Sequence, residues 1–232
     1  VFIDDEQVQS LEQKMNRDGY LDGADMATTF NMLRSNDLIW SFVINNYLMG
    51  EEPLAFDLLY WNSDSTRMPA RMHSEYLRTM YLENRFKEPG GMSLGGVPID
   101  ISTVKTPCYF LSACEDHIAP WRSTFAGAEL FQGPVRFVLS GSGHIAGVVN
   151  PPDANKYGYR TSRTRPRGDA EAWLETATHK EGSWWPNWQQ WVSKFTGTKV
   201  KRRKPGAKKA FPVLEDAPGS YAAKRLDEES PK

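Results

Sequence analysis

Two residues with the chemistry of an acid–base pair, Asp116 and His144, each follow a short apolar run. The runs at 108–111 and 135–139 have the pattern of short strands buried inside a parallel sheet. Reactive groups gather beyond the carboxyl ends of such strands, so neighbouring strands would place this carboxylate and this imidazole side by side. A carboxylate fixes the tautomer of the imidazole, and the ring can then move a proton between a nucleophile and a leaving group.

The partner that this pair requires, a nucleophile, is not evident. An Asp followed by a His on consecutive late strands is the α/β-hydrolase order, which needs a Gly-x-Ser/Cys-x-Gly elbow earlier in the chain. No such motif precedes Asp116. We interpret Cys108 and Cys114 as buried small residues, and Ser142 has no helix after it. The alternative is that Asp116 is only a turn residue and His144 an ordinary loop histidine.

The remaining histidines indicate no further site. His117 is interpreted as a solvated or hydrogen-bonding neighbour of Asp116, and His73 and His179 as structural residues in helices or at helix ends. The four histidines are too scattered to suggest a metal site, and no cofactor is expected.

A βαβ unit would position the pair. The sequence predicts a helix over 121–131 between the two strands, which makes them parallel neighbours with a right-handed crossover. A tight loop of small residues, 140–143, then leads to His144. After a polar loop to about residue 169, we expect a short helix over 170–178 and an aromatic terminal helix over 184–191.

The first third of the chain reads as helical. Apolar spacing predicts helices over 6–15 and 24–33, and a third through Leu48 with its N-cap at 35–37. That third helix is apolar on most sides, which is typical of a buried or partner-bound helix. A further aromatic helix over 70–86 and a small hairpin at 92–94 and 97–99 follow.

Composition excludes several classes of protein. The 232 residues carry a formal net charge of -1, which argues against a dedicated nucleic-acid binder. Two cysteines exclude a disulfide scaffold and favour a cytosolic protein. No apolar run is long enough to span a membrane, and the sequence does not open on a basic-then-apolar segment, so we do not expect a secreted protein.

The two ends of the sequence carry separate predictions. The chain opens on Val1-Phe2-Ile3, which reads as the end of a core strand, so we expect the C-terminal part of a larger protein. The basic stretch from Lys199 to Lys209 is followed by acidic residues, and we interpret it as a solvated, loosely ordered tail rather than a nucleic-acid or phosphate contact.

Several motifs closely resemble class I polyhydroxyalkanoate synthases, the poly(3-hydroxybutyrate) polymerases. They lie at 33–40 (LRSNDLIW), 45–48 (NNYL), 56–62 (FDLLYWN), 115–121 (EDHIAPW), 142–152 (SGHIAGVVNPP), 182–186 (GSWWP) and 217–221 (APGSY). The motif that contains His144 is highly specific. The chain departs from the family in its length, and the basic stretch and the acidic end match no motif of the family.

The resemblance implies the C-terminal portion of an α/β-hydrolase fold with an inserted helical cap, without the half that carries the nucleophile elbow. Residues 1–90 would be the cap, 91–197 the last part of the core with the Asp and His loops, and 198–232 a flexible tail. In this family the cap controls substrate entry and contributes to dimer contacts.

The resemblance also implies the reaction. A cysteine outside this chain, activated by His144, would attack the thioester of an (R)-3-hydroxyacyl-CoA, and the 3-hydroxyl of a second unit would then extend the polyester and release the enzyme. Asp116 would orient His144 and help to activate that hydroxyl. The implied protein is a cytoplasmic homodimer at the surface of polyhydroxyalkanoate granules, and the chain alone is expected to be inactive.

Two other functions stay open at this point. An esterase or polymer depolymerase would use the same Asp116 and His144 with a serine in the elbow. A granule-binding module without catalytic activity would use only the aromatic segments.

Overall fold

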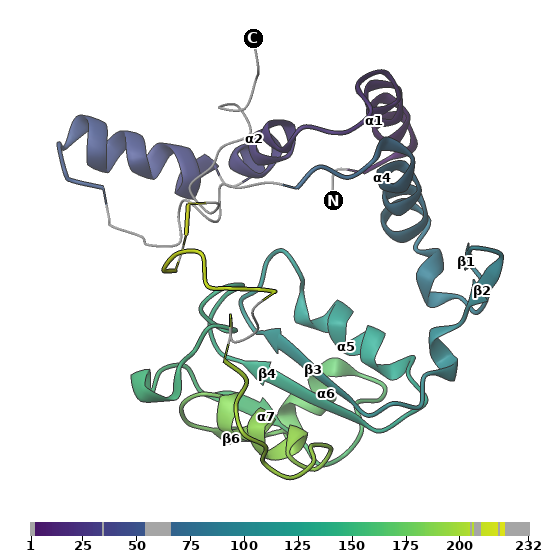
Figure 1. The fold of residues 1–232 in the computed structure, drawn as a ribbon, viewed down its shortest axis with the longest axis vertical. Helices are drawn as coiled ribbons and strands as arrows, with labels where there is room; N and C mark the ends of the chain where they lie inside the picture. Colours follow the sequence, from purple (N-terminus) through teal and green to yellow (C-terminus); the bar gives the residue numbers. More distant parts are fainter. Residues whose placement is uncertain are drawn as a thin grey trace. The chain divides into compact units, whose positions relative to one another are not determined.

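The computed structural model describes residues 3–33, 35–53, 66–204, 206, 210–217 and 219–220. The chain forms two compact units, one of Val1–Leu82 with Val200–Lys232 and one of Glu83–Lys199 (Figure 1). The motif at 56–62, the opening strand-like residues Val1 and Phe2, and the acidic end lie outside the described residues.

The first unit is built on two packed helices, α1 (Asp5–Asp18) and α4 (Ala70–Tyr76). Helix α1 begins after Asp4, whose carboxylate accepts the N–H of Gln7, and ends at Gly19, which has φ +84. Val8 and Met15 are fully buried, as expected from the apolar spacing of this predicted helix.

Helix α2 confirms the predicted helix over 24–33, whereas the later helical segments of this unit differ from the predictions. Helix α2 spans Gly23–Leu33, but the third helix consists largely of two π-helical turns, Asn36–Trp40 and Val43–Leu48. Helix α4 likewise continues as a π-helical segment, Leu77–Leu82, at which the first unit ends. The predicted N-cap at Ser35 is wrong, because its backbone is already helical and its side chain makes no capping bond.

Several apolar side chains of the third helix are exposed in the described part of the chain. Trp40 is 55% exposed and Tyr47 is 83% exposed. No helix among the described residues is long and apolar enough to cross a membrane.

The second unit opens with a 3-10 turn, Arg85–Lys87, and continues through the predicted hairpin into a mixed sheet. Strands β1 (Met92–Leu94) and β2 (Val97–Ile99) pair antiparallel, and a 3-10 turn, Ile101–Thr103, follows. Strands β3 (Cys108–Ala113) and β4 (Val135–Ser140) are parallel neighbours joined through helix α5 (Trp121–Glu129), which confirms the βαβ prediction.

Two further strands extend this sheet where the sequence predicted other structure. Strand β5 (Tyr159–Thr161) lies in the predicted polar loop, and β6 (Thr178–Lys180) follows the short helix α6 (Ala170–Thr176). Both pair antiparallel, which gives the order β3-β4-β5-β6. His179 therefore lies on a strand, and its predicted helix-end context is wrong. The mixed sheet with helices confirms an α/β class for this unit.

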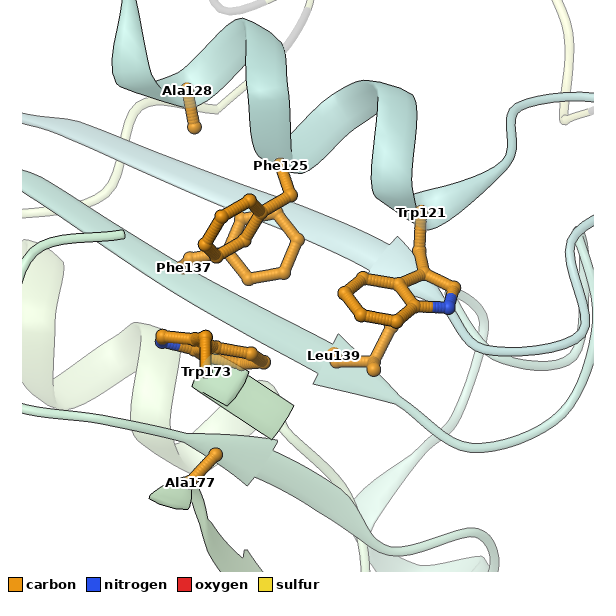
Figure 2. Packing of buried hydrophobic residues seen from close by; sticks show 7 residues of the cluster. All are labelled: Trp121, Phe125, Ala128, Phe137, Leu139, Trp173 and Ala177. Carbon is orange, nitrogen blue, oxygen red and sulfur yellow. The ribbon is translucent and has the colours of Figure 1, made fainter. Parts of the chain in front are cut away.

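One face of the sheet carries the main hydrophobic core. Figure 2 shows Phe125 of α5 lying against Phe137 of β4, with Trp173 of α6 beside them. The ring centroids of Phe125 and Phe137 are 5.2 Å apart, and those of Phe137 and Trp173 are 5.1 Å apart, both edge-to-face. Such pairs contribute roughly 0.5–1.5 kcal/mol each beyond their buried area, so this cluster fixes β4 firmly beneath the two helices.

On the opposite face, the aromatic helix α7 (Trp185–Val192) contacts strand β3 through Tyr109. Side chains alternate across a strand, so Phe110 of β3 packs toward the main core while Tyr109 faces the other side. The Tyr109 hydroxyl donates a hydrogen bond to Asn187 Oδ1 at 3.0 Å, and the Tyr109 ring lies 5.3 Å from that of Trp191. Helix α7 is thereby attached to the strand that leads to Asp116.

Candidate active site

The loops after β3 and β4 run together beyond the strand ends. The Cys114 N–H donates to the Ser140 carbonyl at 2.8 Å, and the Glu115 N–H donates to the Ser142 carbonyl at 3.0 Å. These bonds continue the strand pairing into the loops. As a result His144 Nδ1 lies 2.9 Å from Asp116 Oδ2. The structure brings together the two residues that the strand order predicted to be neighbours.

Asp116 is held as a carboxylate. Its side chain is 8% exposed, and Oδ1 accepts the backbone N–H groups of Ile118 at 2.9 Å and Ala119 at 2.8 Å. Burial raises the pKa of this carboxyl, but the N–H groups and the bond to His144 together outweigh it, so the pKa is lowered. Asp116 is therefore ionised at neutral pH.

The ionised carboxylate determines the tautomer of His144. A carboxylate can only accept hydrogen bonds, so a neutral imidazole facing it at Nδ1 carries its proton there and has its lone pair on Nε2. The His144 side chain is 46% exposed. The ring thus combines an oriented base with access to a reacting group.

The loop after His144 turns back tightly against the sheet. The Gly147 N–H donates to the Gly143 carbonyl at 2.9 Å. A Cβ atom at Gly147 would lie 2.6 Å from the Cβ of Ala113 and 2.7 Å from the carbonyl oxygen of Gly141. Glycine is required at this position because the loop packs directly on the last residue of β3. Earlier in the loop, Ser142 adopts φ +68, a conformation that serine rarely adopts.

Two tryptophans hold this loop from the start of α7. The indole N–H of Trp184 donates to the Gly147 carbonyl at 3.1 Å, and that of Trp185 donates to the Val148 carbonyl at 3.0 Å. Both rings also line a shallow apolar groove with Pro152 and Trp188, with a volume of about 630 Å³. The sequence predicted an aromatic helix here but not these contacts, because no periodic pattern relates residues so far apart.

In the described part of the chain, each cysteine sulfur faces a backbone carbonyl rather than the His144 ring. Cys108 Sγ lies 3.2 Å from the Thr106 carbonyl, and Cys114 Sγ lies 3.9 Å from the Ser142 carbonyl. Cys114 is exposed, so its interpretation as a buried residue is wrong, and Cys108 is half-buried.

The other histidines lie in different settings. His117 is exposed beside Asp116, and His179 is exposed on β6. His73 is only 3% exposed within α4, and its burial lowers the pKa of the imidazole. His73 thus has the buried position expected of a structural residue.

Comparison with curated proteins gives strong matches over nearly the whole chain. The chain is 54% identical over 227 residues to the poly(3-hydroxyalkanoate) polymerase subunit PhaC of Rhizobium meliloti (strain 1021), which covers 97% of this chain and 36% of that protein. It is 52% identical over 222 residues to the poly(3-hydroxyalkanoate) polymerase of Methylorubrum extorquens, covering 95% of this chain and 36% of that protein.

A more distant relative is the PhaC subunit of Cupriavidus necator H16, which is 40% identical over 226 residues, covering 95% of this chain and 38% of that protein. The chain thus spans little more than a third of the length of these relatives. The aligned part includes Asp116 and His144, since nearly all of the chain is aligned. No family model matches the chain.

Proposed function

We propose that this chain is part of a poly(3-hydroxyalkanoate) polymerase and that Asp116 and His144 are the acid–base pair of its acyl-transfer site. The observation that carries the proposal is the 2.9 Å contact between His144 Nδ1 and an ionised Asp116 at the ends of two parallel strands. The names of the relatives supply the substrate class, since each is a poly(3-hydroxyalkanoate) polymerase.

In the proposed reaction, a cysteine thiol supplied from outside these 232 residues gives its proton to His144 Nε2. The thiolate attacks the carbonyl carbon of an (R)-3-hydroxyacyl-CoA thioester, the bond to the CoA sulfur breaks, and the imidazolium returns the proton to the departing thiol. The 3-hydroxyl of a second unit then gives its proton to the same imidazole and attacks the enzyme thioester. An ester forms, the bond to the cysteine sulfur breaks, and the imidazolium returns the proton to the departing cysteine.

Asp116 has two roles in this scheme. Its Oδ2 holds the proton of His144 on Nδ1 and stabilises the positive charge that the ring acquires in each proton transfer. Its Oδ1 is fixed by the N–H groups of Ile118 and Ala119, so the carboxylate keeps its orientation through the cycle.

The proposed setting follows the family. Residues 1–90 belong to a helical cap region, 91–197 to an α/β-hydrolase core and 198–232 to a tail, and the enzyme works in the cytoplasm as a homodimer at the granule surface. Helices within 1–90 and the mixed sheet within 91–197 support a cap and a core, whereas the compact units divide at Leu82 and group Val200–Lys232 with the first unit. The 232-residue chain alone is inactive, because the attacking thiol lies elsewhere.

The test uses the whole polymerase that contains this chain. Asp116→Asn and His144→Ala should each lower the rate of CoA release from 3-hydroxybutyryl-CoA by about 10³-fold or more, because the base is removed or held in the wrong tautomer. His117→Gln, the adjacent histidine, is the matched control and should stay within a few-fold of wild type.

Two outcomes would contradict the proposal. Normal CoA release by His144→Ala would show that His144 is not the base. Conversion of the substrate to free 3-hydroxybutyrate, with no polymer, would favour the hydrolase alternative.

A further inference from the structure

The segment after His144 is held in place mainly through its backbone. It forms a compact turn, in which the N–H groups of Val148 and Val149 donate to the Ile145 carbonyl at 3.0 and 2.8 Å. The side chains of Ile145, Val148 and Val149 are all exposed. The turn is therefore fixed by its backbone, through the packing of Gly147 on Ala113 and through bonds to its outward carbonyls.

Those carbonyls are bound by two adjacent residues of a different element. Trp184 binds the Gly147 carbonyl and Trp185 binds the Val148 carbonyl, each through its indole N–H. An indole has two side-chain torsions and a single donor, so it makes such a bond at a lower cost in conformational entropy than a long polar side chain would.

The start of α7 is itself held in place. The backbone N–H of Trp185 donates to the hydroxyl of the buried Ser183 at 3.1 Å. Farther along the helix, Asn187 accepts the hydrogen bond of Tyr109 from β3. A continuous set of contacts thus runs from β3 through α7 to the loop that carries His144.

We propose that Trp184 and Trp185 are positioning residues for His144, which hold its loop so that the imidazole stays aligned between Asp116 and the reacting thiol. The inference rests on the proposed role of His144 as the base. Neither tryptophan touches the reacting atoms in this scheme, and both act through the loop backbone.

The experiment separates the indole N–H from the ring. In the whole polymerase, Trp184→Phe and Trp185→Phe remove the donor and keep an aromatic ring against the groove. Each should lower kcat for CoA release by about fivefold, which corresponds to roughly 1 kcal/mol, and leave KM within about twofold. Amide hydrogen exchange of residues 143–149 should speed up in both variants, while exchange in β3 and β4 stays unchanged.

Trp188→Phe is the matched control, because Trp188 lines the same groove but does not bind the loop carbonyls of Gly147 and Val148 in the described structure. It should change neither the loop exchange nor kcat. Unchanged exchange over 143–149 in both test variants would overturn the inference, and so would a change in KM alone. If Trp184→Phe fails to fold, the test rests on Trp185→Phe, whose bond is the more exposed.

Failure of the two proposals can be told apart. Full activity of His144→Ala would refute the assignment of His144 as the base. Faster amide exchange of the loop in the Trp variants would still show that the indoles hold the loop. If exchange over 143–149 in the Trp variants stays as slow as in wild type while His144→Ala is inactive, only the positioning role is refuted.

Discussion

The two units of the chain use their apolar residues in different ways. In the second unit, large aromatic side chains converge from α5, α6 and β4 and bury one another. In the first unit, Val8, Met15 and Leu21 are buried, whereas Trp40 and Tyr47 in the π-helical turns and Phe42 between these turns are largely exposed. A high apolar content therefore does not by itself make a core, because a core needs elements that face one another.

This difference decides which unit can fix reactive side chains in position. Asp116 and His144 extend from strands that the aromatic cluster fixes, and their 2.9 Å contact depends on residues within the same unit. The predictions below test this contrast between a unit that fixes its own side chains and one that leaves many exposed.

The largest effect on stability should come from Phe137→Ala. Phe137 is 1% exposed and contacts both Phe125 and Trp173, so its removal leaves a cavity that the helices cannot fill. We expect a loss of about 3–5 kcal/mol in the free energy of unfolding. Urea unfolding followed by tryptophan fluorescence measures it, and a loss below about 1 kcal/mol would mean that the cluster is not the core of this unit.

A smaller loss should follow from Gly147→Ala. The added methyl would overlap the Cβ of Ala113 and the carbonyl oxygen of Gly141, so the loop must shift. We expect about 1–3 kcal/mol of destabilisation, together with a fall in CoA release that exceeds the effect of the matched change Gly127→Ala, since Gly127 has open space around it. Equal activity of the two variants would show that the loop tolerates movement.

The first unit should respond to acid through His73. Burial lowers the pKa of this imidazole from its ordinary value of 6.5, so the unfolded chain binds a proton more readily than the folded one. The helix pair α1–α4 should keep its full stability above about pH 6.5 and lose part of it as the pH falls below that value. Hydrogen exchange over 70–76, measured between pH 5 and 8 and corrected for intrinsic exchange rates, follows this loss.

The matched variant for that prediction is His73→Leu, which fills a similar volume without a titrating group. It should remove the acid-dependent part of the exchange. If wild type and variant show the same pH dependence, another group in this unit is responsible.

The smallest effect should come from Tyr47→Ser on the exposed helix. Tyr47 is 83% exposed, and surface changes of this kind stay within about 0.5 kcal/mol. Chemical unfolding of the two proteins in parallel checks it. A loss of 2 kcal/mol or more would show that this side chain is buried in solution, and the contrast between the units would no longer hold.

The features predicted correctly from the sequence are those that local residue patterns specify. The strands β3 and β4 and the helix between them follow from apolar runs and breakers, and the meeting of Asp116 with His144 follows from the rule that reactive groups gather at the carboxyl ends of parallel strands. These steps need no knowledge of distant contacts.

Features that depend on distant partners could not be predicted. Strands β5 and β6 have three residues each and include Arg160 and His179, so their pairing rests on the backbone and leaves no apolar pattern. The π-helical turns were missed because a single inserted residue per turn changes no composition signal. The hydrogen bonds of Trp184 and Trp185 to the His144 loop join residues far apart in the sequence, so only the three-dimensional structure reveals them.

Strand β3 has one further consequence. Within the described part of the chain it pairs with β4 alone and lies at the border of the sheet. A border strand with apolar side chains is a template for any extended segment that meets it, including the same strand of another copy. Concentrated solutions of the isolated chain would thus favour association through β3, which leads directly into the Asp116 loop. Self-association would then act directly on the Asp116 loop, and the 2.9 Å contact between Asp116 and His144 would be disturbed without unfolding of the unit.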